Sequence, residues 1–415
     1  MPAVNALHAI IVLGVVLGGS VFVGILFRRF KQPAVVGIIF FGLLIGTILA
    51  VSPQHIKSVL LSPTSTSLID AVGEAALLLL MFMVGIELRT YSKSGEKSPM
   101  WQLVPCVVIP MVVCAATAWP FADRLAGSDG KPLLAWLFVG VALGVTAVPV
   151  LVLLTRDLGV PAPIPGSALR IAITADATAW ALVTALVVLN KDLSAVSVPE
   201  LCVGVALLVA VMFPLPQIVR WVFQGSQQSG AIVLAMFAYA LAGGTATQVF
   251  GIHPAIGAVI AGLFFPAGLV NEASQKALAT VADIIIPAFF VSAVLSVPLQ
   301  TLADLCQWSG LLFLLTLTIA AFVAKFSVGL LAGRMKRWPL SSSAELGVLL
   351  NCRGVSELAM ASVGLQSHLI GHYGFAIIFA LALLTTAMIA TLYRAINTVA
   401  RARKSRVDVQ EVSRA

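Results

Sequence analysis

One stretch, from Leu346 to Leu365, reads "LGVLLNCRGVSELAMASVGL". Almost every residue in it is apolar, as expected for a helix that lies in a lipid bilayer. Its centre nevertheless contains Arg353, Gly354 and Glu357. An ionisable side chain in the hydrocarbon costs at least ~2.5–3.5 kcal/mol on insertion scales, so it needs a partner or a function.

The composition places the whole chain in a membrane. Its 415 residues are 60% hydrophobic and only 10% charged, whereas a typical soluble domain is roughly 25% charged. Apolar stretches of about 20 residues, long enough to cross a bilayer, recur along nearly the entire sequence. We therefore expect an all-α integral membrane protein with no large soluble domain. The five cysteines have no metal-ligand spacing, and no cofactor is expected.

Thirteen membrane spans can be placed along the chain. They cover about 6–28, 33–52, 66–88, 100–122, 132–155, 165–190, 198–221, 229–250, 253–270, 277–298, 304–333, 341–366 and 372–398. With the N-terminus outside, most basic residues fall on one side of the membrane and only Lys57, Arg124, Lys131 and Lys191 on the other. Basic residues are enriched in cytoplasmic loops, so the C-terminus is predicted to be cytoplasmic. The net charge of +8 then reflects topology rather than an acidic partner such as a nucleic acid.

Two spans begin alike. The second reads "PAVVGIIFFGLLIG" from Pro33 and the ninth reads "PAIGAVIAGLFFP" from Pro254. In the predicted topology they cross the membrane in opposite directions, so spans one to six and eight to thirteen would form two inverted repeats joined by the seventh. Transporters with this architecture hold their substrate near the bilayer midplane, between the repeats.

Two ionisable residues share a depth in the membrane. Asp176 lies nine residues after Ser167, and Lys325 lies nine residues before Arg334. At 1.5 Å per residue, each is about 14 Å from the cytoplasmic side. We expect Asp176 to bind a monovalent cation or a proton, but not easily both, and Lys325 to pair with it when the site is empty. The alternative is a purely structural ion pair between two helices.

Two spans are expected to be interrupted at matching positions of the two repeats. The fifth contains Thr146 and Pro149, and a proline removes a backbone donor and disturbs the preceding turn. The twelfth is weakened by Gly354 at its centre. Paired interrupted helices indicate a binding site, where Thr146 and freed carbonyl groups would hold the cation together with Asp176.

The remaining polar residues of the twelfth span are expected to support this break. Arg353 and Glu357 are four residues apart, so they share a helix face and are predicted to form an ion pair. Arg353 would also offset the negative ends of the half-helices. Asn351 and Ser356 would satisfy backbone groups. An ordinary kinked helix with a structural salt bridge is the alternative.

Five other polar residues have simpler interpretations. Asp70 and Glu74 lie near the outer end of the third span and Asp283 near the inner end of the tenth, so helix-end or interface positions are expected. Glu345 is expected to be a solvated acid near the start of the twelfth span. His253 is expected to be structural.

Several motifs, in this order, resemble those of the monovalent cation:proton antiporter-2 family of the sodium/hydrogen exchanger superfamily. They are "RRFKQPAVVGIIFFGLLIGT", "VGEAALLLLMFMVGIELR", "VTAVPVLVLLTRDLGV", "TADATAW", "FGIHPAIGAVIAGLFFP", "IIPAFFVSAVLSV", "AKFSVGLLAGR" and "NCRGVSEL". The resemblance extends over nearly the entire length.

The resemblance implies the sodium/proton antiporter fold, with two inverted repeats and crossed discontinuous helices, in a homodimer that works as an elevator. Asp176 would be loaded alternately with Na⁺ or K⁺ and with H⁺. The implied division is a dimerisation domain (1–98 and 229–302), a core ion-transport domain (99–192 and 303–400), a linker helix (193–228) and a basic cytoplasmic tail (401–415). The implied location is a bacterial inner or plasma membrane.

Three positions depart from the family pattern. Ala175 stands where an asparagine or aspartate precedes the key acid, Ile38 replaces a common glutamate, and Val294 replaces a usual glycine. Other readings therefore remain: a channel, a non-transporting membrane sensor or enzyme on the same scaffold, or a bile-acid-symporter-like transporter of organic anions, which Arg353 would suit. The motif order favours antiport.

Overall fold

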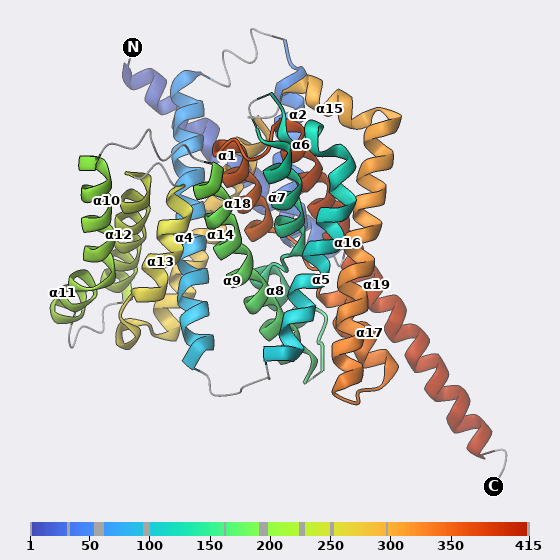
Figure 1. The fold of residues 1–415 in the computed structure, drawn as a ribbon. Coiled ribbons are helices and arrows are strands. Elements are labelled where there is room, and N and C mark those ends of the chain that lie inside the picture. Colours follow the sequence, from blue (N-terminus) through green and yellow to red (C-terminus); the bar gives the residue numbers. More distant parts are fainter. Residues whose placement is uncertain are drawn as a thin grey trace.

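The computed structural model describes residues 2–30, 34–53, 62–93, 100–128, 130–161, 163–190, 198–223, 229–249, 253–295 and 298–412. Within these ranges the regular structure is helical (Figure 1), which confirms the all-α expectation. Pro33, Lys57 and Lys191, on which parts of the predicted repeat and topology rest, lie outside the described residues. So does the side chain of Val294.

The helices are α1 (Pro2–Arg29), α2 (Ala34–Val51), α4 (Pro63–Lys93), α5 (Met100–Ala118), α6 (Ala122–Ala126), α7 (Pro132–Gly144), α8 (Val148–Asp157), α9 (Ile164–Asn190), α10 (Val198–Met212), α11 (Pro214–Val222), α12 (Ser229–Gln248), α13 (Pro254–Phe264), α14 (Glu272–Leu295), α15 (Leu299–Cys306), α16 (Trp308–Met335), α17 (Leu340–Leu349), α18 (Val355–Gln366) and α19 (His372–Val412).

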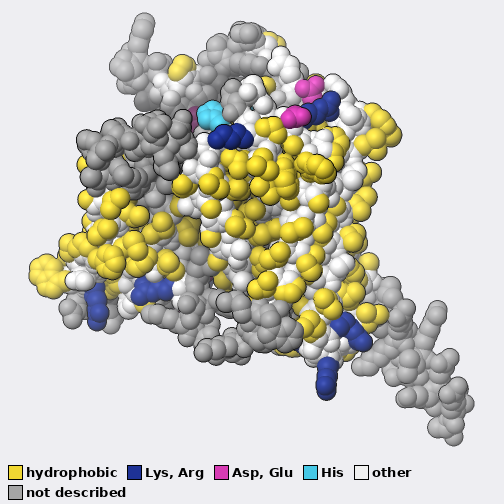
Figure 2. All heavy atoms as spheres, in the orientation of Figure 1, with side chains coloured by type: hydrophobic (Ala, Val, Ile, Leu, Met, Phe, Trp, Pro, Cys, Tyr) yellow, Lys and Arg dark blue, Asp and Glu magenta, His cyan; other side chains and the backbone are white. Residues whose placement is uncertain are grey.

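Eight helices in the described ranges are long and apolar enough to cross a membrane, or nine if α10 and α11, which bend by 44°, form one span. The thirteen predicted spans therefore stay a prediction. Two of them are split into half-helices, α7 with α8 and α17 with α18, and α13 has only 11 residues. Figure 2 shows apolar side chains over the middle of one face, with charged side chains toward its upper and lower edges. This is the pattern of a multi-pass integral membrane protein.

The helices pack in two groups. α4 packs against α13 and α14, α12 against α13, and α1 and α2 against each other and α14. In the other group, α5 packs against α7 and α16, α16 against α17, and α19 against α17 and α18. Figure 1 shows α10 to α13 on one side of the bundle and α15 to α17 on the other. The broken helices belong to the second group.

Small residues let the first group pack closely. A Cβ atom added at Gly257 of α13 would lie 1.9 Å from the carbonyl oxygen of Gly243 in α12, and one added at Gly262 would lie 2.0 Å from that of Phe82 in α4. Any larger residue would force these helices apart. Such close approach through small residues is typical of helices in a bilayer, where dispersion and not water exclusion drives helix association.

Candidate ion-binding site

Two helices are interrupted, as expected. α7 ends at Gly144 and α8 begins at Val148, so the chain is not helical between them. Pro149 lies in the first turn of α8, where a missing N–H costs no intrahelical hydrogen bond. α17 ends at Leu349 and α18 begins at Val355. Gly354 stands at the second break, and a Cβ atom there would lie 2.6 Å from Cγ2 of Val150.

The two breaks are tied together directly. The Ala147 amide donates to the carbonyl oxygen of Cys352 at 2.9 Å. Beside it, the Thr146 hydroxyl donates to the carbonyl oxygen of Leu350 at 2.7 Å. The first interrupted segment therefore donates two hydrogen bonds to the second, and these satisfy two carbonyl oxygens beside the end of α17.

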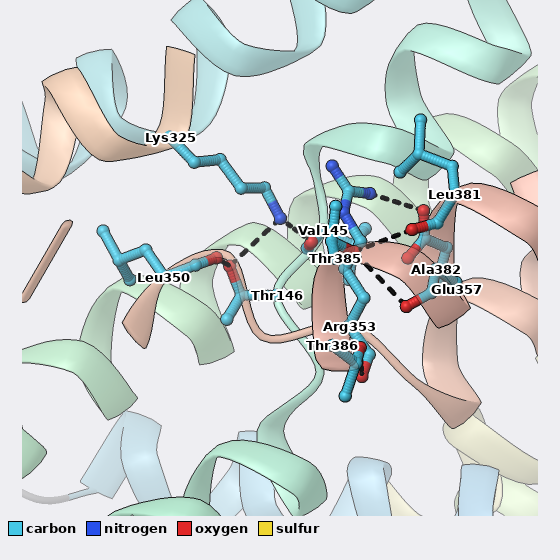
Figure 3. A network of polar contacts seen from close by, with 10 residues as sticks. All are labelled: Val145, Thr146, Lys325, Leu350, Arg353, Glu357, Leu381, Ala382, Thr385 and Thr386. Atoms are coloured by element: carbon cyan, nitrogen blue, oxygen red, sulfur yellow. Dashed lines mark hydrogen bonds and ion pairs between the residues drawn. The ribbon is translucent and has the colours of Figure 1, made fainter. Parts of the chain in front are cut away.

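The side chain of Lys325, in α16, reaches the place where the two interrupted helices meet. Its side chain is 2% exposed, and Nζ donates to the carbonyl oxygen of Val145 and to Oγ1 of Thr146, the latter at 3.3 Å (Figure 3). Val145 follows the last residue of α7, where carbonyl oxygens are left without helical partners. The lysine thus contacts the negative end of a half-helix.

The predicted ion pair between Arg353 and Glu357 is present. Nη1 of Arg353 donates to Oε1 of Glu357, and both side chains are buried (Figure 3). The carbonyl oxygen of Arg353 accepts a hydrogen bond from Oγ1 of Thr386 in α19 at 2.8 Å. Within the described part of the chain, Nε and Nη2 of Arg353 and Oε2 of Glu357 have no hydrogen-bond partner.

Asp176 of α9 is 1% exposed, and neither carboxylate oxygen has a hydrogen-bond partner among the described residues. The hydroxyl of Ser356, buried at the start of α18, lies beside it, and Glu87 and Lys325 are near enough to interact with it electrostatically. The direct pair expected between Asp176 and Lys325 is not formed. The break in α7 leaves the carbonyl oxygen of Val145 free, and the amino group of Lys325 binds there instead.

The amide nitrogen of Asn351 donates to the carbonyl oxygen of Gly347 at 2.9 Å, which is the backbone role expected for it. Asn351 Oδ1 and Ser356 Oγ have no hydrogen-bond partner in the described ranges. Two residues that interact with this site, Glu87 and Thr386, were not predicted from the sequence. Glu87 stands close to Arg89 in the sequence and reads as an ordinary helix-end acid, and Thr386 reads as one of many hydroxyls in an apolar helix.

The other polar residues fall into three classes. Asp70 and Glu74 are exposed and line a cavity of about 440 Å³ between α4, α14, α18 and α19, consistent with an interface position. Nδ1 of His253 accepts from the Ala255 amide at 3.1 Å and caps α13, a structural role.

The expectation that Glu345 is a solvated acid was wrong. It is 5% exposed, because α17 packs against α19, and Tyr393 can donate to it at 3.3 Å.

A family model described as "Sodium/hydrogen exchanger, transmembrane" matches residues 15–395. The chain belongs to this sodium/hydrogen exchanger family. The family is one of transporters and not of enzymes, and the match confirms the resemblance seen in the motifs.

Individual relatives of this exchanger-family chain agree with that assignment. It is 28% identical to cation/H(+) antiporter 17 of Arabidopsis thaliana over 89% of its own length and 46% of the relative's. It is 25% identical to the Na(+)/H(+) antiporter NhaS4 of Synechocystis over 91% of its length and 94% of the relative's. The chain thus spans about half the length of its Arabidopsis relatives.

A solved structure supports the fold. The sodium proton antiporter MjNhaP1 of Methanocaldococcus jannaschii superposes with a TM-score of 0.63 over 94% of this chain and 97% of that one, at 16% identity. The expected antiporter fold is therefore confirmed.

Proposed function

We propose that this chain is a secondary antiporter that exchanges a monovalent cation, Na⁺ or K⁺, for H⁺, with Asp176 as the carrying group. The observation behind the proposal is the buried carboxylate of Asp176, whose oxygens have no hydrogen-bond partner in the described residues. An unpaired carboxylate is too costly to bury. It therefore carries a proton or a cation, and one small site does not hold both.

The printed names of the relatives support the same activity. The Arabidopsis relative is a cation/H⁺ antiporter and the Synechocystis relative is a Na⁺/H⁺ antiporter. In our proposal Ser356 supplies an oxygen ligand beside Asp176, while Thr146 joins the cation only when Lys325 leaves its hydroxyl. Arg353 and Glu357 neutralise one another and hold α18 in place. Asn351 and Gly354 shape the second break, as Pro149 shapes the first.

We further propose that the domains move as an elevator within a homodimer. The core (99–192 and 303–400) would carry the ion past the dimerisation domain (1–98 and 229–302). The cavity lined by Asp70 and Glu74 supports this division, because its walls come from α4 and α14 on one side and from α18 and α19 on the other. The C-terminus would lie in the cytoplasm of a cell with this protein in its inner or plasma membrane.

The test is proton flux in proteoliposomes. We expect Asp176→Asn to reduce cation-dependent collapse of a pH gradient to the level of protein-free vesicles, while the purified protein elutes and melts as the parent does. Asp283→Asn is the matched control, because Asp283 is also a carboxylate within an apolar helix but is exposed. We expect it to retain flux. Cation-dependent flux that survives Asp176→Asn would end the proposal.

A further inference from the structure

A groove of about 500 Å³ runs between α16 and α19, on the surface of the second helix group. Its walls are large apolar side chains that are each 45% to 56% exposed, namely Leu311, Leu315, Ile319, Val323, Leu384 and Met388. The hydroxyl groups of Thr318 and Thr385 also line it, but each donates to a carbonyl oxygen of its own helix. The groove therefore offers no hydrogen-bond donor to its occupant, and an apolar chain suits it.

The length of the groove matches one leaflet of a bilayer. Val323 lies twelve residues after Leu311, which is about 18 Å along α16 at 1.5 Å per residue. The hydrocarbon core of a bilayer is about 30 Å thick, so each leaflet contributes about 15 Å. The basic residues Arg334 and Lys336 lie at the other end of α16, so the groove belongs to the leaflet on the predicted outer side. One acyl chain of a membrane lipid has the length and the chemistry to fill it.

Charged side chains of both signs lie at the outer end of the groove, where α16 and α19 begin. Nη1 of Arg124 in α6 donates to Oγ of Ser309 in the first turn of α16 at 3.4 Å. α6 and α15 both pack against α19, and Arg124 and Asp304 of α15 are near enough to Tyr373 to interact with it electrostatically. Figure 2 shows acidic and basic side chains beside one another at this upper edge of the molecule.

These groups suit a headgroup that carries both charges. A guanidinium has five N–H donors, which match the oxygens of a phosphate. The hydroxyl of Tyr373 has no hydrogen-bond partner among the described residues and is available to donate to the same oxygens. The carboxylate of Asp304 accepts from Nε2 of Gln307 at 3.0 Å and has further lone pairs for an ammonium group.

From this arrangement we infer that the groove between α16 and α19 is a binding site for a zwitterionic phospholipid with a primary ammonium group, such as phosphatidylethanolamine. One acyl chain fills the groove, Arg124 and Tyr373 bind the phosphate, and Asp304 binds the ammonium. An anionic headgroup leaves Asp304 without a partner, and a quaternary ammonium has no N–H to donate. The inference goes beyond the proposed function, because lipid binding does not depend on which ion is carried.

The site would support the second helix break from outside. Thr385 forms part of the groove wall, and its neighbour Thr386 donates to the carbonyl oxygen of Arg353 at 2.8 Å. An acyl chain in the groove packs against this part of α19 and so favours the folded arrangement around the break.

The test is the melting temperature of the full-length protein in detergent with added lipid. We expect long-chain phosphatidylethanolamine to raise it by about 2–5 °C, because a ligand that binds only the folded state stabilises that state. Phosphatidylglycerol, phosphatidylcholine and a phosphatidylethanolamine with chains too short to fill the groove should each give less than half of this rise. Equal stabilisation by the three long-chain lipids, or a larger effect of phosphatidylglycerol, would overturn the inference.

Two pairs of variants locate the effect. Ile319→Trp fills the groove and should abolish the rise, whereas Leu331→Trp, at an equally exposed position of α16 outside the groove, should retain it. Arg124→Gln should lower the retention of phosphatidylethanolamine in native mass spectrometry by about two- to tenfold, as expected for the loss of one hydrogen bond. Lys131→Gln, which removes an exposed lysine on the same predicted side, should leave retention unchanged.

A full lipid response in Ile319→Trp or in Arg124→Gln would contradict the site. A change in the elution volume of Ile319→Trp without loss of the lipid response would assign the groove to a contact between two copies of the chain, and would also overturn the inference. If Ile319→Trp does not fold, the comparison of long-chain with short-chain phosphatidylethanolamine on the parent decides whether an acyl chain occupies the groove.

Discussion

At the residue scale, the two buried cations beside the helix breaks, Arg353 and Lys325, have different kinds of partner. Arg353 is paired with a carboxylate on its own helix, whereas Lys325 contacts a backbone carbonyl and a hydroxyl on another segment. The planar guanidinium suits a carboxylate, and the compact ammonium suits a small cluster of oxygens. The two residues therefore differ in what their removal would leave behind: an unpaired acid in one case and an unfilled oxygen site in the other.

The Arg353–Glu357 pair gives a prediction of this kind. Arg353→Met should destabilise the protein by about 3–5 kcal/mol, because it leaves a buried carboxylate unpaired. The double variant Arg353→Met, Glu357→Leu should recover most of that loss, because it buries no charge. Thermal unfolding in detergent measures both. A double variant that is less stable than Arg353→Met would show that the pair contributes more than mutual neutralisation.

The sequence predicted part of this chemistry and not the rest. The spacing of Arg353 and Glu357 was enough to predict their pair, because four residues on a helix fix the geometry. The partner of Lys325 was not predictable, since the Val145 carbonyl becomes an acceptor only through the exact place where α7 ends. Thr385 and Thr386 show the same limit. Thr385 bonds Leu381 within its own helix, while its neighbour reaches another segment.

At the element scale, the two interruptions were predictable from the sequence, whereas the number of membrane spans stays a prediction. Pro149 and Gly354 signalled both breaks from sequence. The predicted ninth span covered about 253–270, whereas α13 ends at Phe264 after 11 residues. Burial of Glu345 was missed for a related reason: α17 is a half-helix whose polar start packs against α19. Apolar length alone does not distinguish a complete span from half of one.

The contact between α12 and α13 gives a prediction at this scale. Gly257→Ala should cost about 1–3 kcal/mol, because its Cβ atom would lie 1.9 Å from a carbonyl oxygen of α12 and backbone cannot rotate away. Gly18→Ala is the control, since a Cβ atom there meets nothing within 4 Å. That variant should be neutral or gain up to about 1 kcal/mol from helix propensity. A Gly257→Ala protein as stable as Gly18→Ala would contradict the close packing.

At the scale of the whole molecule, the proposed competition between cation and proton for Asp176 predicts how transport responds to pH. As the pH falls, Asp176 is protonated in a larger fraction of the molecules, so a larger cation concentration is needed for half-maximal flux. The apparent KM for the cation should rise by up to about tenfold per pH unit wherever the acid is mostly protonated. The maximal rate should stay nearly constant. Initial rates in proteoliposomes over several pH values measure this, and a constant KM with a falling maximal rate would rule out simple competition.

The proposed elevator movement also predicts the effect of a cross-link. Ser292 of α14 and Gln366 of α18 line the same cavity from the two helix groups. In a variant without the native cysteines, a disulfide between Ser292→Cys and Gln366→Cys should stop flux, and reduction of the disulfide should restore it. Ser292→Cys joined to Asp70→Cys is the control, because these residues already touch within one group at 2.6 Å. Full flux through the first cross-linked pair would contradict relative movement of the two groups.

The hydrogen bond from the Ala147 amide to the Cys352 carbonyl has a consequence for how such proteins diversify. It joins main chain to main chain, so every amino acid except proline at position 147 can donate it. Mutations that alter side chains around the candidate ion-binding site can accumulate without disrupting this main-chain connection between the two breaks. A lineage can therefore change which ion it prefers one replacement at a time, while each intermediate sequence still reaches the same architecture.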